Sequence, residues 1–199
     1  MKYCDERDYC CDYIVRRIIE LKNKNLIFYS MKHLCFFYKG NNEYKKDYSF
    51  VINNAYIFRV IQTKDNEICY NVEKNLCFYD LIQRKIITKI DYATPLNMMT
   101  KDLLLVAVEN KLKIINVKLH NLIRIIDIPG SGAIYCICML NDNMLLTADL
   151  YGRIIQWKIE GDNLKLFSKK ELAHKGAICT LLKIGNGLIL SGGNDVRIW

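Results

Sequence analysis

Proline and glycine are scarce in this sequence of 199 residues, which contains two prolines and ten glycines. This content excludes collagen-like and linker-like architectures, because both need these residues in long stretches. Long apolar runs are missing too, since no uncharged stretch reaches the roughly 18 residues of a membrane-spanning helix. The longest candidate, residues 128–141, contains a proline and two glycines. We therefore expect a globular domain with no membrane span.

A secretory signal is also missing, because residues 1–8 are polar and acidic rather than apolar. The nine cysteines of the chain are then expected to stay reduced in the cytosol or nucleus. We predict a cytoplasmic or nuclear protein that is not secreted.

Metal-binding patterns are weak, because the three histidines lie far apart in the sequence. Zinc sites usually combine two pairs of Cys or His residues at C-x₂₋₄-C spacing. Neither Cys10-Cys11 nor Cys136-x-Cys138 has that spacing. Cys136 and Cys138 would instead share one face of a strand, where small thiols pack well. We predict no metal site.

Glycine-rich segments at residues 130–132 and 192–193 lack the following Lys-Ser or Lys-Thr and open no helical pattern. Phosphate-binding loops need such features, so these glycines are interpreted as turn residues. The thirteen tyrosines could stack on bases, but most alternate with apolar residues, as strand positions do. We predict no cofactor.

The net charge of +8 is spread along the chain, with +4 of it in residues 151–199. Nucleic-acid-binding domains usually concentrate Lys and Arg on one face. Lys169, Lys170 and Lys175 form the densest local cluster, near an expected loop. The cluster could favour an acidic partner or RNA, or it could be an ordinary solvated loop.

A repeat becomes visible at the two tryptophans, Trp157 and Trp199, which are 42 residues apart. Residues 145–157 and 188–199 both consist of an apolar run, a turn, a second apolar run and Trp. Weaker copies extend the pattern toward the N-terminus, so that five units end at residues 37, 79, 115, 157 and 199.

Each unit contains short runs rich in Ile, Val, Tyr, Phe and Leu, separated by polar pairs. That composition is typical of strands and hairpin turns. Near the N-terminus, residues 14–21 also fit one face of a helix. The similarity between residues 13–18 and 56–61 favours a strand there. Four strands in about 42 residues is the spacing of a β-propeller blade.

The last two units resemble the WD-repeat family, whose blades carry a Gly-His near the start and a Trp-Asp at the end of the third strand. The matching residues are 174–178, 191–193 and 195–199. The resemblance implies an all-β fold, an incomplete WD-repeat β-propeller of about five four-stranded blades, the last lacking its final strand. We expect an N-terminal segment at residues 1–12, open to disorder, followed by a propeller at 13–199 with blades near 13–53, 55–90, 93–128, 133–170 and 177–199.

The resemblance also implies a structural hydrogen-bond tetrad within a blade. It places His174, Ser191, Asp195 and Trp199 in the four positions of the last blade. Such a network stabilises the fold when every member is present.

The fourth blade keeps only part of this tetrad. Aligned with the last blade, it retains Thr147 and Trp157, whereas Gly130 and Tyr151 replace the His and Asp. The earlier units are expected to depend mainly on apolar packing.

His174, Ser191 and Asp195 are also the residue types of a hydrolase triad. Ser191, however, does not lie in a Gly-x-Ser-x-Gly motif. We therefore predict no catalytic residues and no enzymatic activity.

The resemblance implies a ring of about seven blades, and this sequence ends at the third strand of its fifth unit. Three explanations are open: a fragment of a longer protein, a ring completed by a partner or a second copy, or closure with fewer blades or help from residues 1–12. The predicted function is a protein–protein interaction scaffold within a larger assembly. The alternative is an RNA-associated propeller subunit of a ribonucleoprotein complex.

Overall fold

The computed structural model describes residues 15–41, 43–52, 56–72, 75–91 and 96–199. The predicted segment at residues 1–12 lies outside these ranges. Within them the chain forms nineteen strands and one short 3-10 turn, Gly185–Gly187. The predicted all-β class is confirmed.

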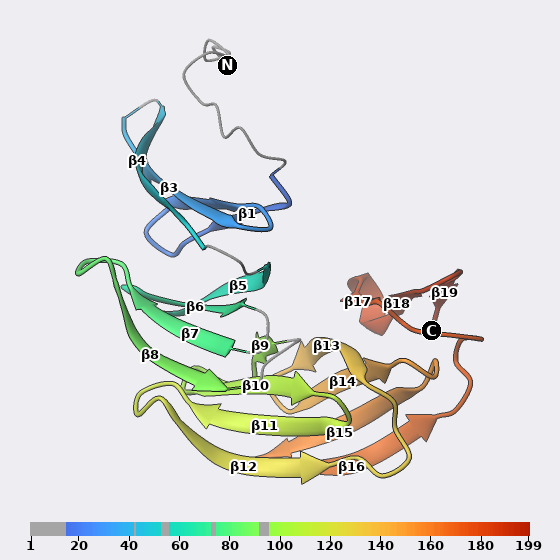
Figure 1. Cartoon of the computed structure of the whole chain (residues 1–199). Helices are drawn as coiled ribbons and strands as arrows, with labels where there is room; N and C mark the ends of the chain where they lie inside the picture. The colour runs from blue at the N-terminus through green and yellow to red at the C-terminus, as the bar shows by residue number, and fades with distance from the viewer. Residues whose placement is uncertain (1–14, 42, 53–55, 73–74, 92–95) are drawn as a thin grey trace. The chain divides into compact units, whose positions relative to one another are not determined.

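The strands form five antiparallel sheets, each built in sequence order as a meander (Figure 1). Blades 1 and 2 contain β1 (Arg17–Glu20), β2 (Leu26–Tyr29), β3 (His33–Lys39) and β4 (Tyr44–Val51), then β5 (Ile57–Lys64), β6 (Glu67–Val72), β7 (Asn75–Asp80) and β8 (Lys85–Asp91). Blade 3 contains β9 (Leu96–Met98), β10 (Leu103–Val108), β11 (Lys111–Asn116) and β12 (Asn121–Asp127). Blade 4 contains β13 (Ile134–Asn141), β14 (Met144–Asp149), β15 (Ile154–Glu160) and β16 (Asn163–Lys170). Blade 5 has three strands, β17 (Thr180–Lys183), β18 (Ile189–Gly192) and β19 (Val196–Ile198).

Five blades of this kind, the last with three strands, make the predicted β-propeller architecture. Arg17–Glu20 pairs with β2 as a strand, which confirms the strand interpretation at these four residues over the helical one. The chain divides into two compact units, residues 1–73 with 77–87 and residues 74–76 with 88–199.

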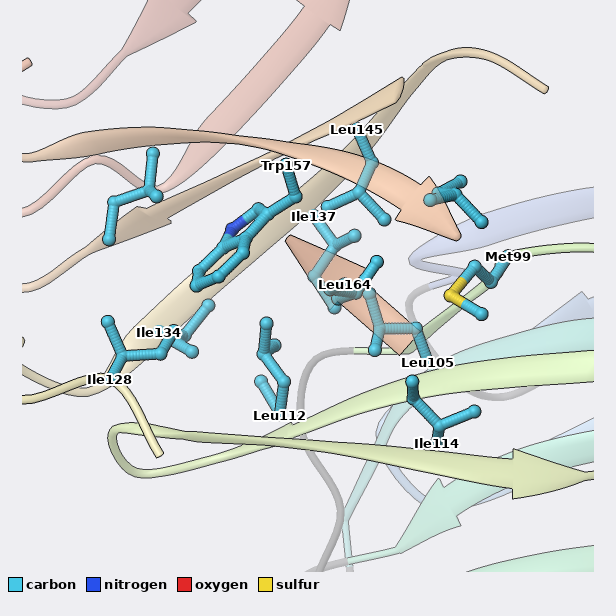
Figure 2. Close-up of a cluster of buried hydrophobic side chains, with 13 residues drawn as sticks. Met99, Leu105, Leu112, Ile114, Ile128, Ile134, Ile137, Leu145, Trp157 and Leu164 are labelled. Carbon is cyan, nitrogen blue, oxygen red and sulfur yellow. The ribbon is translucent and has the colours of Figure 1, made fainter. Parts of the chain in front are cut away.

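Burial follows the position of a strand within its blade. The second strand of blade 3, β10, has the sequence LLLVAV and is almost wholly buried, whereas the outermost strand β12 is mostly exposed. A strand covered on both faces needs apolar residues without alternation. The core of the second unit accordingly lies between facing blades: Figure 2 shows Trp157, Leu145 and Ile137 of blade 4 packed toward Leu105 and Leu112 of blade 3.

In blades 1, 3 and 4, a register shift interrupts the outermost strand pair at the residue that ends the sequence unit. The shifts fall between Phe36 and Phe37, Ile114 and Ile115, and Gln156 and Trp157. Each leaves one extra residue in the outer strand, namely Asp47, Ile123 and Phe167. A bulge of this type twists an edge strand and makes it a poorer template for pairing with another chain.

Candidate functional site

The structure brings the four predicted residues of the last blade into one hydrogen-bonded chain. Trp199 Nε1 donates to Ser191 Oγ (2.7 Å), and Ser191 Oγ bonds to His174 Nε2 (2.6 Å). His174 Nδ1 bonds in turn to Asp195 Oδ1. If the Ser191 hydroxyl donates to a neutral imidazole, every donor in the chain meets an acceptor. These hydrogen bonds connect the loop before β17, strand β18, the turn after it and the residue that follows β19.

The two ends of this chain differ in exposure. Ser191 has an exposed fraction of 0% and His174 is buried, whereas Asp195 is partly exposed. Arg197 Nε donates to Asp195 Oδ2 at 2.8 Å. The Arg197 guanidinium, together with His174, holds the pKa of the Asp195 carboxyl below its ordinary value. A fully buried Ser191 hydroxyl, already bonded on two sides, offers a substrate no access.

In the fourth blade, Trp157 Nε1 donates to Thr147 Oγ1 at 2.9 Å, and both side chains are buried. Gly130 has a φ of 70° in the loop before β13, and Tyr151 projects from the β14–β15 turn, where 58% of it is exposed. These two residues take no part in the Thr147–Trp157 bond.

Sequence reasoning missed a buried ion pair in this blade, Asp149 with Arg153. Asp149 Oδ1 accepts from the backbone N–H groups of Tyr151 (2.9 Å) and Arg153 (3.0 Å). Its Oδ2 accepts from Arg153 Nε (2.8 Å) and from the backbone N–H of Gly132 (3.2 Å). The Asp-x-x-Gly-Arg pattern at the start of the turn was the available signal, since Asp commonly bonds to turn N–H groups just after it.

Gly152 lets the last blade's loop lie directly on this turn. The His174 N–H donates to the Gly152 carbonyl at 3.0 Å. Gly152 has a φ of 76°, and a Cβ on it would lie 2.2 Å from the His174 carbonyl oxygen. No residue with a side chain fits there without displacing the loop.

Three loops therefore meet at one end of blades 4 and 5: residues 130–133, 149–153 and 171–178. Further backbone bonds connect them, from Leu150 N to Ala133 O and from Ile178 N to Asp149 O. Exposed side chains project from this bonded frame, among them Leu172 with an exposed fraction of 78%. We call the exposed residues Leu150, Tyr151, Leu172 and Lys175 the loop surface.

Two pockets are candidate ligand sites. One, of about 390 Å³, has an apolar lining that includes Leu146, Ile189 and Trp199. Lys170 Nζ lies 4.0 Å from the centre of the Trp199 ring, so this pocket has a positively charged edge.

The other pocket belongs to the first unit, has a volume of about 200 Å³ and is lined in part by Asp47 and Tyr48. Arg84 makes two bonds to Asp47 (2.9 and 3.0 Å). The same guanidinium lies 4.2 Å from the centre of the Tyr48 ring, and Phe36 stacks on that ring. Burial raises the pKa of the Tyr48 hydroxyl. The cluster links the outer strand of blade 1 to the β7–β8 turn.

Within the described ranges, no three His, Cys, Asp or Glu residues are close enough together to hold a metal ion. The described residues also contain no helix with the length and apolar content needed to span a bilayer.

The fold defines the class of protein: a β-propeller built from repeated antiparallel blades. No protein-family model matches the sequence, and no curated protein matches it. Among solved structures 1081 chains match. One of them is a chain of the crystal structure of the mitotic checkpoint complex, with a TM-score of 0.76, 9% sequence identity and coverage of 93% of this chain. At that identity the likeness shows the fold alone, and the protein described here spans 61% of that neighbour.

Proposed function

We propose that this chain is a WD-repeat propeller that acts as a non-enzymatic scaffold for protein–protein interaction. The observation that carries the proposal is the loop surface, where exposed apolar side chains project from two of three loops that are held together by backbone hydrogen bonds. Binding energy at protein interfaces comes from a few such anchors on a rigid frame. The proposed location is the cytoplasm or nucleus.

The role proposed for His174, Ser191, Asp195 and Trp199 is structural. Their bonds run through the interior of the last blade, and Ser191 is inaccessible. Thr147 and Trp157 are proposed to play the same part in blade 4. A burial pattern of this kind supports cohesion of the blade rather than chemistry on a substrate.

The solved neighbour supports protein partners, because it belongs to a complex of several proteins. This chain spans 61% of that neighbour, which is in keeping with a subunit or fragment of a larger assembly. We propose that further blades of a longer chain, a partner or a second copy of this chain complete the ring.

RNA association is the weaker alternative. Two of the three clustered lysines are already engaged, Lys169 with Glu171 (2.5 Å) and Lys170 with the Trp199 ring. The rest of the +8 charge is spread along the sequence.

Photo-crosslinking in the native cells tests the scaffold proposal. A benzoylphenylalanine replaces Leu172 in one variant and Leu119 in the control. Leu119 is similarly exposed, at 70%, but lies on the β11–β12 turn. We expect a discrete protein adduct from position 172 and none from position 119. RNA adducts, or equal labelling from both positions, would contradict the proposal.

A further inference from the structure

The guanidinium of Arg153 has one nitrogen that no residue described by the structure satisfies. Arg153 is more than nine-tenths buried, and its Nη2 has no hydrogen-bond partner among the described residues. Asp149, its ion-pair partner, already accepts four hydrogen bonds. An unsatisfied donor on a buried charged group is costly, so an acceptor supplied from outside would be bound favourably.

The side chain beside this guanidinium is itself exposed. The Tyr151 ring centre lies 5.2 Å from Arg153 Cζ, and more than half of Tyr151 is accessible. The turn bond of Tyr151 is made by its backbone N–H to Asp149 Oδ1, so the ring can rotate without breaking that bond. Glu171 Oε2 lies 3.8 Å from Arg153 Nε, but the other carboxylate oxygen of Glu171 is held by Lys169 at 2.5 Å.

The surroundings combine an exposed apolar side chain with an exposed lysine. Leu172 is the most exposed side chain of the loop surface and has a φ of 51°, an unfavourable conformation for leucine. Lys175 is exposed and makes no ion pair with any residue that the structure describes.

We propose that the loop surface binds an acidic polypeptide segment that also carries an apolar side chain. One carboxylate of this segment accepts from Arg153 Nη2 after Tyr151 turns aside, and Lys175 adds long-range attraction. The apolar side chain packs on Leu172 and the displaced Tyr151 ring. This inference rests on the proposed scaffold function and specifies the chemistry of its partner. Charge-assisted bonds from arginine to carboxylate are among the strongest available to such a surface.

The probe for this proposal is a fluorescein-labelled hexapeptide, Asp-Glu-Phe-Asp-Glu-Leu, with blocked ends. Its control has Asn and Gln in place of Asp and Glu, so that only the charge differs. With the full chain we expect saturable binding by fluorescence anisotropy, at least about tenfold tighter for the acidic peptide. Backbone amide shifts in an NMR titration are expected at Tyr151, Gly152 and Leu172.

Three variants locate the site. Leu172→Gly removes the apolar contact but suits a φ of 51°, so its fold is retained, and we expect binding to weaken about fivefold. Arg153→Lys keeps the charge but loses the planar fork, and we expect about tenfold weaker binding. Leu119→Ala, on the other turn, is expected to bind like the wild type. If Arg153→Lys fails to fold, the affinity of Leu172→Gly for the acidic peptide still tests the proposal.

Equal affinity for the acidic and neutral peptides, or equal binding by Leu172→Gly and Leu119→Ala, would overturn the inference. A twelve-nucleotide RNA that shifts the same amides and competes with the peptide would overturn it as well. If position 172 crosslinks to a protein in cells but the acidic peptide does not bind, the scaffold function stands and this inference falls.

Discussion

Gly152 and His174 are joined by a backbone hydrogen bond of 3.0 Å that leaves no room for a side chain between blades 4 and 5. A Cβ on Gly152 would lie 2.2 Å from the His174 carbonyl oxygen and 2.7 Å from that of Gly176. The contact between the two loops therefore depends on a glycine.

We expect Gly152→Ala to destabilise the contact between blades 4 and 5 by about 2–4 kcal/mol, from backbone strain and overpacking together. Gly161→Ala is the matched control, because Gly161 also has a positive φ (63°) but no atom lies within 4 Å of its Cβ position. In that control the free energy of unfolding should fall by about 1 kcal/mol, from backbone strain alone. Denaturant unfolding compares the two, and equal losses would show that the close approach is unimportant.

Ser191→Ala is expected to loosen the last blade, because it leaves the Trp199 N–H and His174 Nε2 without their shared partner. The cost expected for such buried groups is about 1–3 kcal/mol each. Hydrogen exchange at the amides of β18 is the suitable measurement, since it reports on this blade separately. Ser168→Ala, which removes an exposed bond to Gln156 (2.9 Å), serves as control. If the β18 amides of Ser191→Ala are protected from exchange as well as those of the wild type, the structural role proposed for the tetrad is wrong.

The last blade should loosen in acid through Asp195. Its pKa is lowered in the folded protein, chiefly by Arg197 and also by His174. A lowered pKa means that the ionised carboxylate contributes stability above the ordinary value of 3.8. This contribution disappears as the pH falls below that value.

Tryptophan fluorescence followed from pH 6 to pH 2.5 measures this transition. In Asp195→Asn the acid-dependent component should be missing, although the blade is less stable at neutral pH. An identical acid profile in the variant would show that other carboxylates control the transition.

Arg84→Lys is expected to weaken the first unit by about 1 kcal/mol, because lysine retains the charge but loses the paired bonds to Asp47 and the stacking on Tyr48. The value is small because both members of the ion pair are partly exposed. Lys22→Ala is the control, since its pair with Asp65 is far more exposed and should contribute almost nothing. Urea unfolding of both variants distinguishes them, and equal effects would show that the Arg84 cluster has no special role.

The spacing of Trp157 and Trp199 was enough to predict the fold class. Each blade is a local meander whose strands follow one another in sequence, so a repeat of about 42 residues translates directly into sheets. The resemblance of the last unit to the WD-repeat family singled out His174, Ser191, Asp195 and Trp199, which the structure joins by hydrogen bonds. Their types and offsets are readable in the sequence because all four lie within 26 residues of one another.

The Asp149–Arg153 pair was not predicted, although its two members are close in sequence. Its significance depends on burial by neighbouring loops, and nothing in a linear pattern shows that Gly132 and Glu171 approach the same turn. The cluster of Asp47, Tyr48 and Arg84 was missed for a similar reason, since its members come from two blades.

By itself the sequence determined the strand pattern and the number of blades, because these follow from local periodicity. The candidate tetrad came from the match of the last unit to the WD-repeat pattern. Tertiary structure alone decided which loops meet, which donor of Arg153 finds no partner among the described residues and which leucine projects from the loop surface. These properties depend on contacts between blades. The same side chain is buried or exposed according to what the neighbouring blade places against it.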